Sequence, residues 1–418
     1  MSPPPAGHPR PLREQAELVD RWLGQRLTEV LPGLLDRARL DTWLVVAREY
    51  HEDPVMAALL PGTWLSARRR TILVFHRVPD GVRALAVAPY PVGSAYESVW
   101  DPALGSQWAA LHASVAARDP RRIGVNVSET FALADGMSAT EHRLTMDALG
   151  AYAERVVLAE QVAIGLLETR LPEEIEVAHE LNALAHNVIA SAYAEVAPGR
   201  TRALDVAWWI QQRFHDLGVP PWFLSTVDIQ RAGVELGSVP DDAVIQPGDL
   251  LHCDVGLSSL RLHTDTQQNA YVLRPGETEP PVGLVEALAV GNHMQDLTVA
   301  AFEVGGTGNQ VLALAREYAA AAGIDAAVYS HPIGLHGHAA GPTVGLWDNQ
   351  LTVPGSGDYP LHGSTLYALE LCTYSAVPEW DGQRVRMALE QGIVLRAGKV
   401  DYLDRRQTAL HLIPAPAG

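Results

Sequence analysis

Short apolar runs alternate with amphipathic segments in the first 155 residues. The runs are rich in β-branched residues and bounded by polar or turn-forming positions, which is typical of buried strands. The segments between them repeat apolar residues at helical spacing. Strands are predicted at 42–48, 71–77, 84–90 and 122–127, and helices at 12–31, 52–60 and 106–119. This alternation predicts an α/β domain near residues 15–155.

The pattern changes after residue 150 to longer amphipathic segments. A helix is predicted at 151–168, followed by two helix pairs at 171–196 with 201–218 and at 280–302 with 307–323. Pro172 at a first-turn position, followed by Glu173 and Glu174, favours a helix start there. Helix pair, strand pair, helix pair and further strands indicate a duplicated unit. We place the boundary between a domain of residues 1–157 and one of 158–418.

Composition and charge narrow the class of protein. The 418 residues suggest two or three domains. The formal net charge of -18 argues against nucleic acid or an anionic membrane surface as the main partner. The sequence has no apolar run long enough to cross a bilayer, and its start lacks the apolar core of a secretory signal. A cytoplasmic protein is therefore expected.

Five polar residues lie in or beside short apolar, strand-like runs of the second half. They are, in chain order, Asp254, Asp265, His331, Glu370 and Glu390. Buried carboxylates are costly unless they are paired or bind a cation, and four of them repel one another strongly at one site. Two divalent metal ions are the simplest source of the missing positive charge. Oxygen donors with one imidazole suit manganese or cobalt better than a thiolate zinc site.

The two aspartates are expected on a hairpin. Residues 249–256 and 261–273 read as two strands joined by a short loop. Alternate strand residues share a face, so His252 lies on the face of Asp254, and Gln267 on that of Asp265. An antiparallel pair lets both polar faces meet over one site. Alone, this segment fits a solvated edge hairpin better than a metal site, and only the other three residues favour the metal site.

These motifs resemble those of the pita-bread metallopeptidases, in particular the branch of Xaa-Pro aminopeptidase, prolidase and creatinase. The segment QPGDLLHCDVG, the spacing to Asp265, and the register of His331, Gly334 and His338 are similar to that family, as are the places of Glu370 and Glu390. The resemblance implies an α/β N-terminal domain plus an α+β pita-bread C-terminal catalytic domain. It also implies a homodimer that cleaves a small peptide or amide substrate.

The resemblance further implies a role for each residue. Asp265 and Glu390 would bridge two ions, Asp254 would bind one, and His331 with Glu370 the other. Manganese is the expected metal, with cobalt or zinc as alternatives. Glu370 would also act as general base. Within HPIGLHGHAAGP three histidines compete: His331 is the expected ligand, with His336 as the alternative.

Substrate contacts depart from the family pattern. His338 is expected to contact the substrate and stabilise an oxyanion, and His336 to bind substrate or support the ligands. The loop 227–242 lacks the histidine found there in proline peptidases. Ala388 stands where they tend to carry arginine, and Arg386 is the nearest candidate for binding the substrate. Leu371 follows Glu370 in place of the frequent proline. The resemblance thus implies an intact metal site with altered substrate recognition.

Three functions stay open. The favoured one is a dinuclear Xaa-Pro aminopeptidase or a dipeptidase-like enzyme, which cuts near a free N-terminus. The second is a metal-dependent hydrolase of a non-peptide amide or small metabolite. The third is a catalytically silent binding protein, which the full ligand set disfavours. Cys253 and Cys372 imply no disulfide framework. They fit small buried hydrophobic residues better than a zinc–thiolate site.

Overall fold

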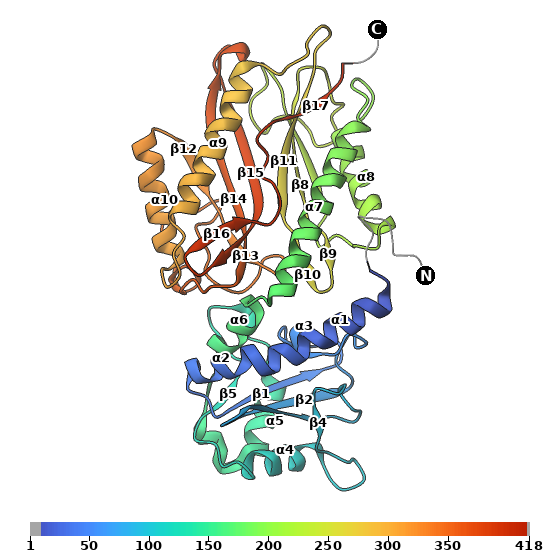
Figure 1. Ribbon diagram of the computed structural model, residues 1–418, viewed down its shortest axis with the longest axis vertical. Helices are drawn as coiled ribbons and strands as arrows, with labels where there is room; N and C mark the ends of the chain where they lie inside the picture. Colours follow the sequence, from blue (N-terminus) through green and yellow to red (C-terminus); the bar gives the residue numbers. More distant parts are fainter. Residues whose placement is uncertain (1–9, 416–418) are drawn as a thin grey trace. The chain divides into compact units, whose positions relative to one another are not determined.

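The computed structural model describes residues 10–415, and the chain divides into two compact units at Leu171–Pro172. Residues 1–9 of the first predicted domain lie outside this range, and the predicted boundary at 157/158 stays a prediction. Residues 10–415 contain no helix with the length and hydropathy needed to cross a bilayer. Figure 1 gives the element labels used below.

The first unit, Arg10–Leu171, is built on a six-stranded mixed sheet of order β4-β3-β2-β1-β5-β6. Apolar side chains of the sheet, including Leu44, Val74 and Ile123, pack with Leu111 and Leu149 from two helices. Its helices and strands are α1 (Leu12–Gln25), α2 (Leu31–Ala38), β1 (Thr42–Arg48), α3 (Met56–Leu59), β2 (Arg70–Val78), β3 (Gly81–Val87), β4 (Glu97–Ser98), α4 (Gln107–Ala116), β5 (Ile123–Val125), α5 (Ala139–Leu149), β6 (Val156–Leu158) and α6 (Glu160–Glu168).

The helix predicted at 151–168 is wrong in its first half. Gly150–Arg155 forms a 3₁₀ turn, β6 follows, and only Glu160–Glu168 is α-helical. β6 pairs in parallel with β5, with Ile123 opposite Val156. Adjacent valines favour a strand, and the open edge of the sheet offers hydrogen bonds that helical periodicity cannot reveal.

The second unit begins at Pro172 and contains a nine-stranded sheet whose main path is β12-β14-β15-β11-β8-β7. Strands β13, β16 and β17 pair with β14, β15 and β11. The elements are α7 (Pro172–Ala194), α8 (Ala203–Asp216), β7 (Thr226–Gln230), β8 (Leu250–Val255), β9 (Ser258–Ser259), β10 (Leu262–His263), β11 (Thr266–Val272), α9 (Val282–Ala300), α10 (Gly308–Ala322), β12 (Asp325–Val328), β13 (His331–Ile333), β14 (Thr365–Val377), β15 (Gln383–Arg396), β16 (Lys399–Tyr402) and β17 (His411–Ile413).

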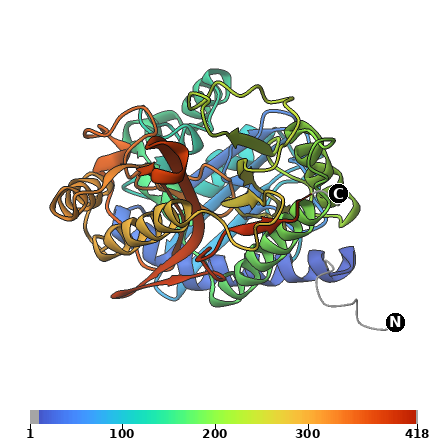
Figure 2. The same ribbon diagram turned by 90° about the horizontal axis from the view of Figure 1, so that it is seen from above.

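Both predicted helix pairs of this unit are present, and each is followed by strands of the sheet. Helices α9 and α10 lie side by side, α9 next to β14 and β15 and α10 next to β12 (Figures 1 and 2), while α7 contacts β11 and α8 contacts β7. Helix α10 begins with a capping box, in which Thr307 Oγ1 accepts from the Gln310 amide and Gln310 Oε1 accepts from the Thr307 amide. The order of these elements confirms the predicted α+β architecture, and the duplicated unit stays a prediction.

A buried carboxyl group gives the first unit an expected pH dependence. Asp53 is fully buried, and its oxygens accept hydrogen bonds from Asn126 Nδ2 at 2.8 Å and the Val55 amide at 3.1 Å. Burial raises the pKa of Asp53 to about 7. Because its folded pKa lies above its unfolded one, the stability it contributes is complete below about pH 4. It is lost as the pH rises through 7.

We therefore expect Asp53→Asn to flatten the pH profile of stability. Between pH 4 and 7 the wild type should lose up to about 1.4 kcal/mol of unfolding free energy per pH unit relative to the variant. Urea unfolding followed by circular dichroism at matched pH values measures this. Subtracting the variant from the wild type cancels all other titrating groups. Parallel profiles would show that the Asp53 carboxyl does not titrate in this range.

Candidate metal centre

The five predicted ligands come together over the middle of the nine-stranded sheet. Asp254 lies on β8, Asp265 directly precedes β11, and Glu370 and Glu390 lie opposite each other on β14 and β15. His331 begins β13, which pairs with β14. The sequence dictates this meeting because β8 and β11 pair antiparallel, as the alternation around the two aspartates predicts. Segments more than 130 residues apart in the chain thus contribute to one site.

The side chains are close enough to share a cation. In residues 10–415, three groups of potential ligand atoms lie within 4.8 Å of one another, and all draw on this cluster. The groups are Asp254, Asp265 and Glu390; His331, Glu370 and Glu390; and Asp265, His331 and His338. His331 Nε2 lies 3.7 Å from Asp265 Oδ2 and 3.7 Å from Glu390 Oε1, too far for hydrogen bonds.

The electrostatics of the cluster are unfavourable without added positive charge. Burial raises the pKa of Asp254, and that of Glu370 to about 8, where Glu390 adds repulsion. Burial and neighbouring carboxylates raise the pKa values of Asp265 and Glu390 well above their usual range. Burial lowers the pKa of His331, which keeps its imidazole neutral. A divalent cation reverses this balance by favouring ionised carboxylates and neutral imidazole.

Unpartnered buried atoms fit a metal ion. Asp254 Oδ1, Asp265 Oδ1, Glu390 Oε1 and His331 Nε2 are buried and have no hydrogen-bond partner in the described residues. Unsatisfied buried polar atoms are rare in folded proteins and call for a ligand. Three carboxylate oxygens and an imidazole nitrogen are donors that Mn²⁺, Co²⁺ and Zn²⁺ accept. The residues present therefore fit the group that the sequence implies.

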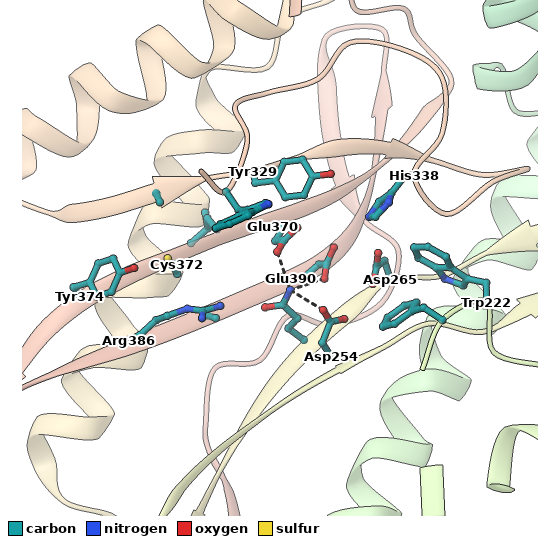
Figure 3. A pocket seen from close by; sticks show the side chains of 16 residues that line it. Trp222, Asp254, Asp265, Tyr329, His338, Glu370, Cys372, Tyr374, Arg386 and Glu390 are labelled. Atoms are coloured by element: carbon teal, nitrogen blue, oxygen red, sulfur yellow. Dashed lines mark hydrogen bonds between the residues drawn. The ribbon is translucent and has the colours of Figure 1, made fainter. Parts of the chain in front are cut away.

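The carboxylates line a cavity of about 480 Å³ with two different ends. Figure 3 shows Trp222 and His338 at one end and Tyr374, Cys372 and Arg386 at the other, with the carboxylates between them. Further aromatic lining comes from Phe223, Tyr329 and Trp347. Sequence reasoning missed all the aromatic residues, because single aromatic residues in loops carry no pattern. The volume suits a small substrate, and the aromatic end and the Arg386 end suit an apolar part and a charged part of it.

The three competing histidines take different places. His331 is buried in the cluster, whereas His338 is exposed and lines the cavity. The His338 ring centroid lies 4.8 Å from that of His331 and 5.2 Å from that of Trp222. His336 is half-buried and is absent from the described residues that line the cavity. Its backbone carbonyl accepts a hydrogen bond from the Gly334 amide at 3.0 Å. The roles given to the histidines stay predictions.

Replacing His338 with alanine is expected to separate substrate contact from metal binding. If the imidazole donates to a developing oxyanion, the rate should fall about 10²- to 10³-fold while the metal content stays unchanged. Rate measurements combined with metal analysis of the purified variant check this. Loss of metal would make His338 a ligand. If both the metal content and the rate are unchanged, His338 has only a structural role.

His331→Ala should lower metal binding more than His336→Ala. The reverse order would identify His336 as the ligand in place of His331.

The two cysteines take no part in the ligand groups of residues 10–415. Cys253 is buried on β8, on the strand face opposite Asp254, and burial raises the pKa of its thiol to about 12. Cys372 lines the cavity two residues beyond Glu370. This arrangement favours small apolar residues over a zinc–thiolate site.

Comparison with known proteins decides the family. The model of metallopeptidase family M24 matches residues 173–394, which is more than half of the chain and includes all five predicted ligands. The chain belongs to metallopeptidase family M24. Membership confirms the resemblance to the pita-bread metallopeptidases, and it makes the chain a metal-dependent hydrolase. A search of curated proteins finds no match.

Solved structures support the same fold along nearly the whole chain. The X-Pro aminopeptidase from Thermotoga maritima has a TM-score of 0.65 at 16% identity, and the match covers 90% of this chain and 99% of that chain. The Xaa-Pro dipeptidase from Bacillus anthracis has a TM-score of 0.64 at 17% identity, covering 96% and 100%. The prolidase from Pyrococcus furiosus has a TM-score of 0.58 at 16% identity, covering 90% and 99%. At these identities the likeness establishes the fold.

Proposed function

We propose that this M24 protein is a dinuclear metallopeptidase of the Xaa-Pro aminopeptidase or dipeptidase type, which cleaves an amide bond near a free N-terminus. The observation that carries the proposal is the donor set lining the cavity, where three carboxylates and one imidazole have buried atoms without a partner in residues 10–415, and Glu370 lies beside them. Such a set is electrostatically reasonable only around cations. We infer two ions, because four carboxylates balance the charge of two divalent cations, and manganese as the metal, with cobalt or zinc as alternatives.

The ligands divide between the two ions as the resemblance implies. Asp265 and Glu390 would bridge, Asp254 would hold one ion, and His331 with Glu370 the other. When bound, the ions supply Lewis acidity and a water of lowered pKa, as is known for two-metal aminopeptidases in general. The protein's own task is to hold the carboxylates in place, which the strands that carry them do.

Two further residues would handle the proton and the developing charge. Glu370 lines the cavity and would accept the proton of the attacking water and pass it to the leaving amine. His338 would donate a hydrogen bond to the carbonyl oxygen as its negative charge grows. Trp222 and Phe223 form an apolar wall beside His338 that would exclude bulk water from this end.

The opposite end of the cavity suits a carboxylate. Arg386 is the one arginine or lysine among the described residues lining the cavity, and its charge helps to lower the pKa of Asp228. Along β14 and β15 the directly opposed pairs are, in order, Glu370–Glu390, Cys372–Ala388 and Tyr374–Arg386. Arg386 therefore lies two pairs along the strands from the two glutamates. The small Cys372–Ala388 pair leaves a trough between the carboxylates and the guanidinium. A substrate with its free C-terminal carboxylate on Arg386 would place an amide bond over the ligands.

Replacing Arg386 with methionine is expected to weaken recognition of the substrate carboxylate. A charged hydrogen bond contributes about 1.5–3 kcal/mol, so kcat/KM for a free dipeptide should fall about 10- to 100-fold. The C-terminal amide of the same dipeptide should lose little. Arg384→Met is the matched control, because Arg384 lies two residues away on the same strand and pairs with Asp325. Equal losses for the acid and the amide would move the carboxylate site elsewhere.

A substrate panel tests the proposal as a whole. The manganese-loaded protein should hydrolyse dipeptides or short peptides with a free N-terminus faster than N-acetylated peptides and non-peptide amides. Comparing proline with other residues at the second position measures whether proline is required.

A hydrolase of non-peptide amides is the second candidate. It is favoured by the missing histidine in loop 227–242 and by Ala388 at the position where proline peptidases tend to carry arginine. Turnover confined to such amides would replace the peptidase assignment. The homodimer and the cytoplasmic location stay predictions.

A further inference from the structure

One neutral side chain stands in a row of carboxylates that crosses the sheet. The strand registers place Asp254 on β8 opposite Gln267 on β11, Gln267 opposite Glu390 on β15, and Glu390 opposite Glu370 on β14. Neighbouring strands are about 4.8 Å apart, so these four side chains are direct neighbours. Gln267 is therefore flanked on both sides by proposed metal ligands. It is 2% exposed, so no bulk water competes for its amide.

The Gln267 amide donates to three carboxylates (dashed lines in Figure 3). Its Nε2 lies 2.9 Å from Glu390 Oε2, 3.0 Å from Glu370 Oε1 and 3.4 Å from Asp254 Oδ2. An amide nitrogen carries two hydrogens, so the longest contact, to Asp254, is the weakest of the three. Carboxylates accept and cannot donate when ionised, so the –NH₂ group and not the carbonyl must face them.

A second pair of residues fixes this orientation from behind. Gln267 Oε1 lies 2.9 Å from His252 Nε2, and because an amide oxygen only accepts, the imidazole N–H donates to it. The other ring nitrogen of His252 lies 3.3 Å from Asp228 Oδ2 and donates to it when the imidazole is protonated at both nitrogens. His252 and Asp228 are opposite each other on β8 and β7. A chain of contacts thus runs from Asp228 through His252 to Gln267 and the carboxylates.

The hydrogen bonds of the row divide the ligand atoms into two sets. Gln267 binds Asp254 Oδ2 and Glu390 Oε2, whereas Asp254 Oδ1 and Glu390 Oε1 have no partner. Asp265 Oδ1 and His331 Nε2 are likewise buried without a partner in the described residues, so these four atoms are the ones available to a cation. Asp254 and Glu390 therefore each turn one oxygen to the amide and leave the other available to a cation. An arrangement of this kind fixes the rotation of the ligands before a metal arrives.

We propose that Gln267, held by His252 and Asp228, is a positioning residue that preorganises Asp254, Glu370 and Glu390 for cation binding. The inference rests on the proposed function, because it concerns the same metal centre. Gln267 touches neither substrate nor ion in this role. It acts through the carboxylates by neutralising part of their mutual repulsion and by selecting their rotation. Its effect is therefore on metal affinity.

Metal titration of Gln267→Leu tests the proposal. Leucine keeps the apolar volume but removes the amide, so the affinity for Mn²⁺ measured by isothermal titration calorimetry should fall about 10- to 100-fold, as for other outer partners of metal ligands. Gln268→Leu is the matched control, since Gln268 is equally buried on the same strand, points to the opposite face and contacts His411 at 2.6 Å. The control should keep the wild-type affinity.

A second variant keeps the test decisive if Gln267→Leu fails to fold. His252→Phe removes the support but leaves the amide, so its affinity for Mn²⁺ should fall in the same direction by a smaller factor. Unchanged affinity in either folded variant overturns the positioning role. Tighter binding in Gln267→Leu also overturns it and shows that the amide competes with the ion. Absence of Mn²⁺ binding in the wild type would instead refute the proposed metal centre itself, so the two failures are distinguishable.

Discussion

Replacing Glu390 with glutamine is expected to remove bound metal and nearly all turnover. Glu390 belongs to two of the three ligand groups, and so does Asp265, which makes Asp265→Asn its counterpart. Both changes keep the shape of the side chain and remove one negative charge. Because losing an outer partner of a metal ligand costs about 10- to 100-fold, losing a shared ligand should cost more than 100-fold in metal affinity or rate.

The fold should survive these substitutions. Glu390 and Asp265 are 1% and 5% exposed, and in the absence of metal each adds to the repulsion among buried carboxylates. Removing one charge therefore relieves the metal-free protein. Metal analysis, circular dichroism and rate measurements on the same preparation separate loss of metal from loss of fold. Glu379→Gln is the control, because Glu379 is exposed and accepts hydrogen bonds from the Gly283 amide. Retention of both ions and full rate in Glu390→Gln would rule out its role as a ligand.

Local patterns sufficed to predict most of the fold. The helices α7, α8, α9 and α10 follow from amphipathic periodicity, together with the start signal at Pro172 for α7. The hairpin of β8 and β11 follows from alternation around the two aspartates. β6 could not be predicted, because its three residues are stabilised by pairing with β5, a partner that only the tertiary structure supplies.

The candidate site likewise has residues that the sequence indicates and residues that only the tertiary structure places. Asp254, Asp265, His331, Glu370 and Glu390 stand out in the sequence because charged residues inside apolar runs are unusual. The structure brings all five together, although their roles as ligands stay predictions. The place of Gln267 between Asp254 and Glu390 depends on the pairing of β11 with β15, whose residues are 123 positions apart. The one available signal was its position two residues after Asp265, on the same strand face.

The aromatic end of the cavity had no such signal. Trp222 and Phe223 lie in the segment between α8 and β7, and Trp347 follows β13 in a long loop. Loops position side chains through tertiary contacts, such as the hydrogen bond from Trp222 Nε1 to the Thr264 carbonyl at 2.8 Å. Substrate preference is therefore the part of the function least accessible from sequence, while the metal chemistry is the part most accessible.

Removing the metal is expected to abolish activity and to lower stability together. Without cations the four carboxylates repel one another and also repel the anionic transition state of amide hydrolysis, so chelated protein should show no turnover. Adding Mn²⁺ or Co²⁺ back should restore the rate, with a stoichiometry approaching two ions per chain. A ligand present at 100 times its Kd raises the free energy of unfolding by about 2.7 kcal/mol for each site.

The linked stability change makes this prediction independent of the choice of substrate. Thermal unfolding of chelated and Mn²⁺-loaded wild type should differ clearly in Tm, whereas Glu390→Gln should show little difference because it cannot hold the ions. Rate, stoichiometry and Tm should therefore rise over the same range of metal concentration. Full activity in metal-free protein would contradict the metal mechanism. A metal-dependent Tm in the wild type without turnover of any peptide would instead separate metal binding from peptidase function and favour the non-peptide substrates.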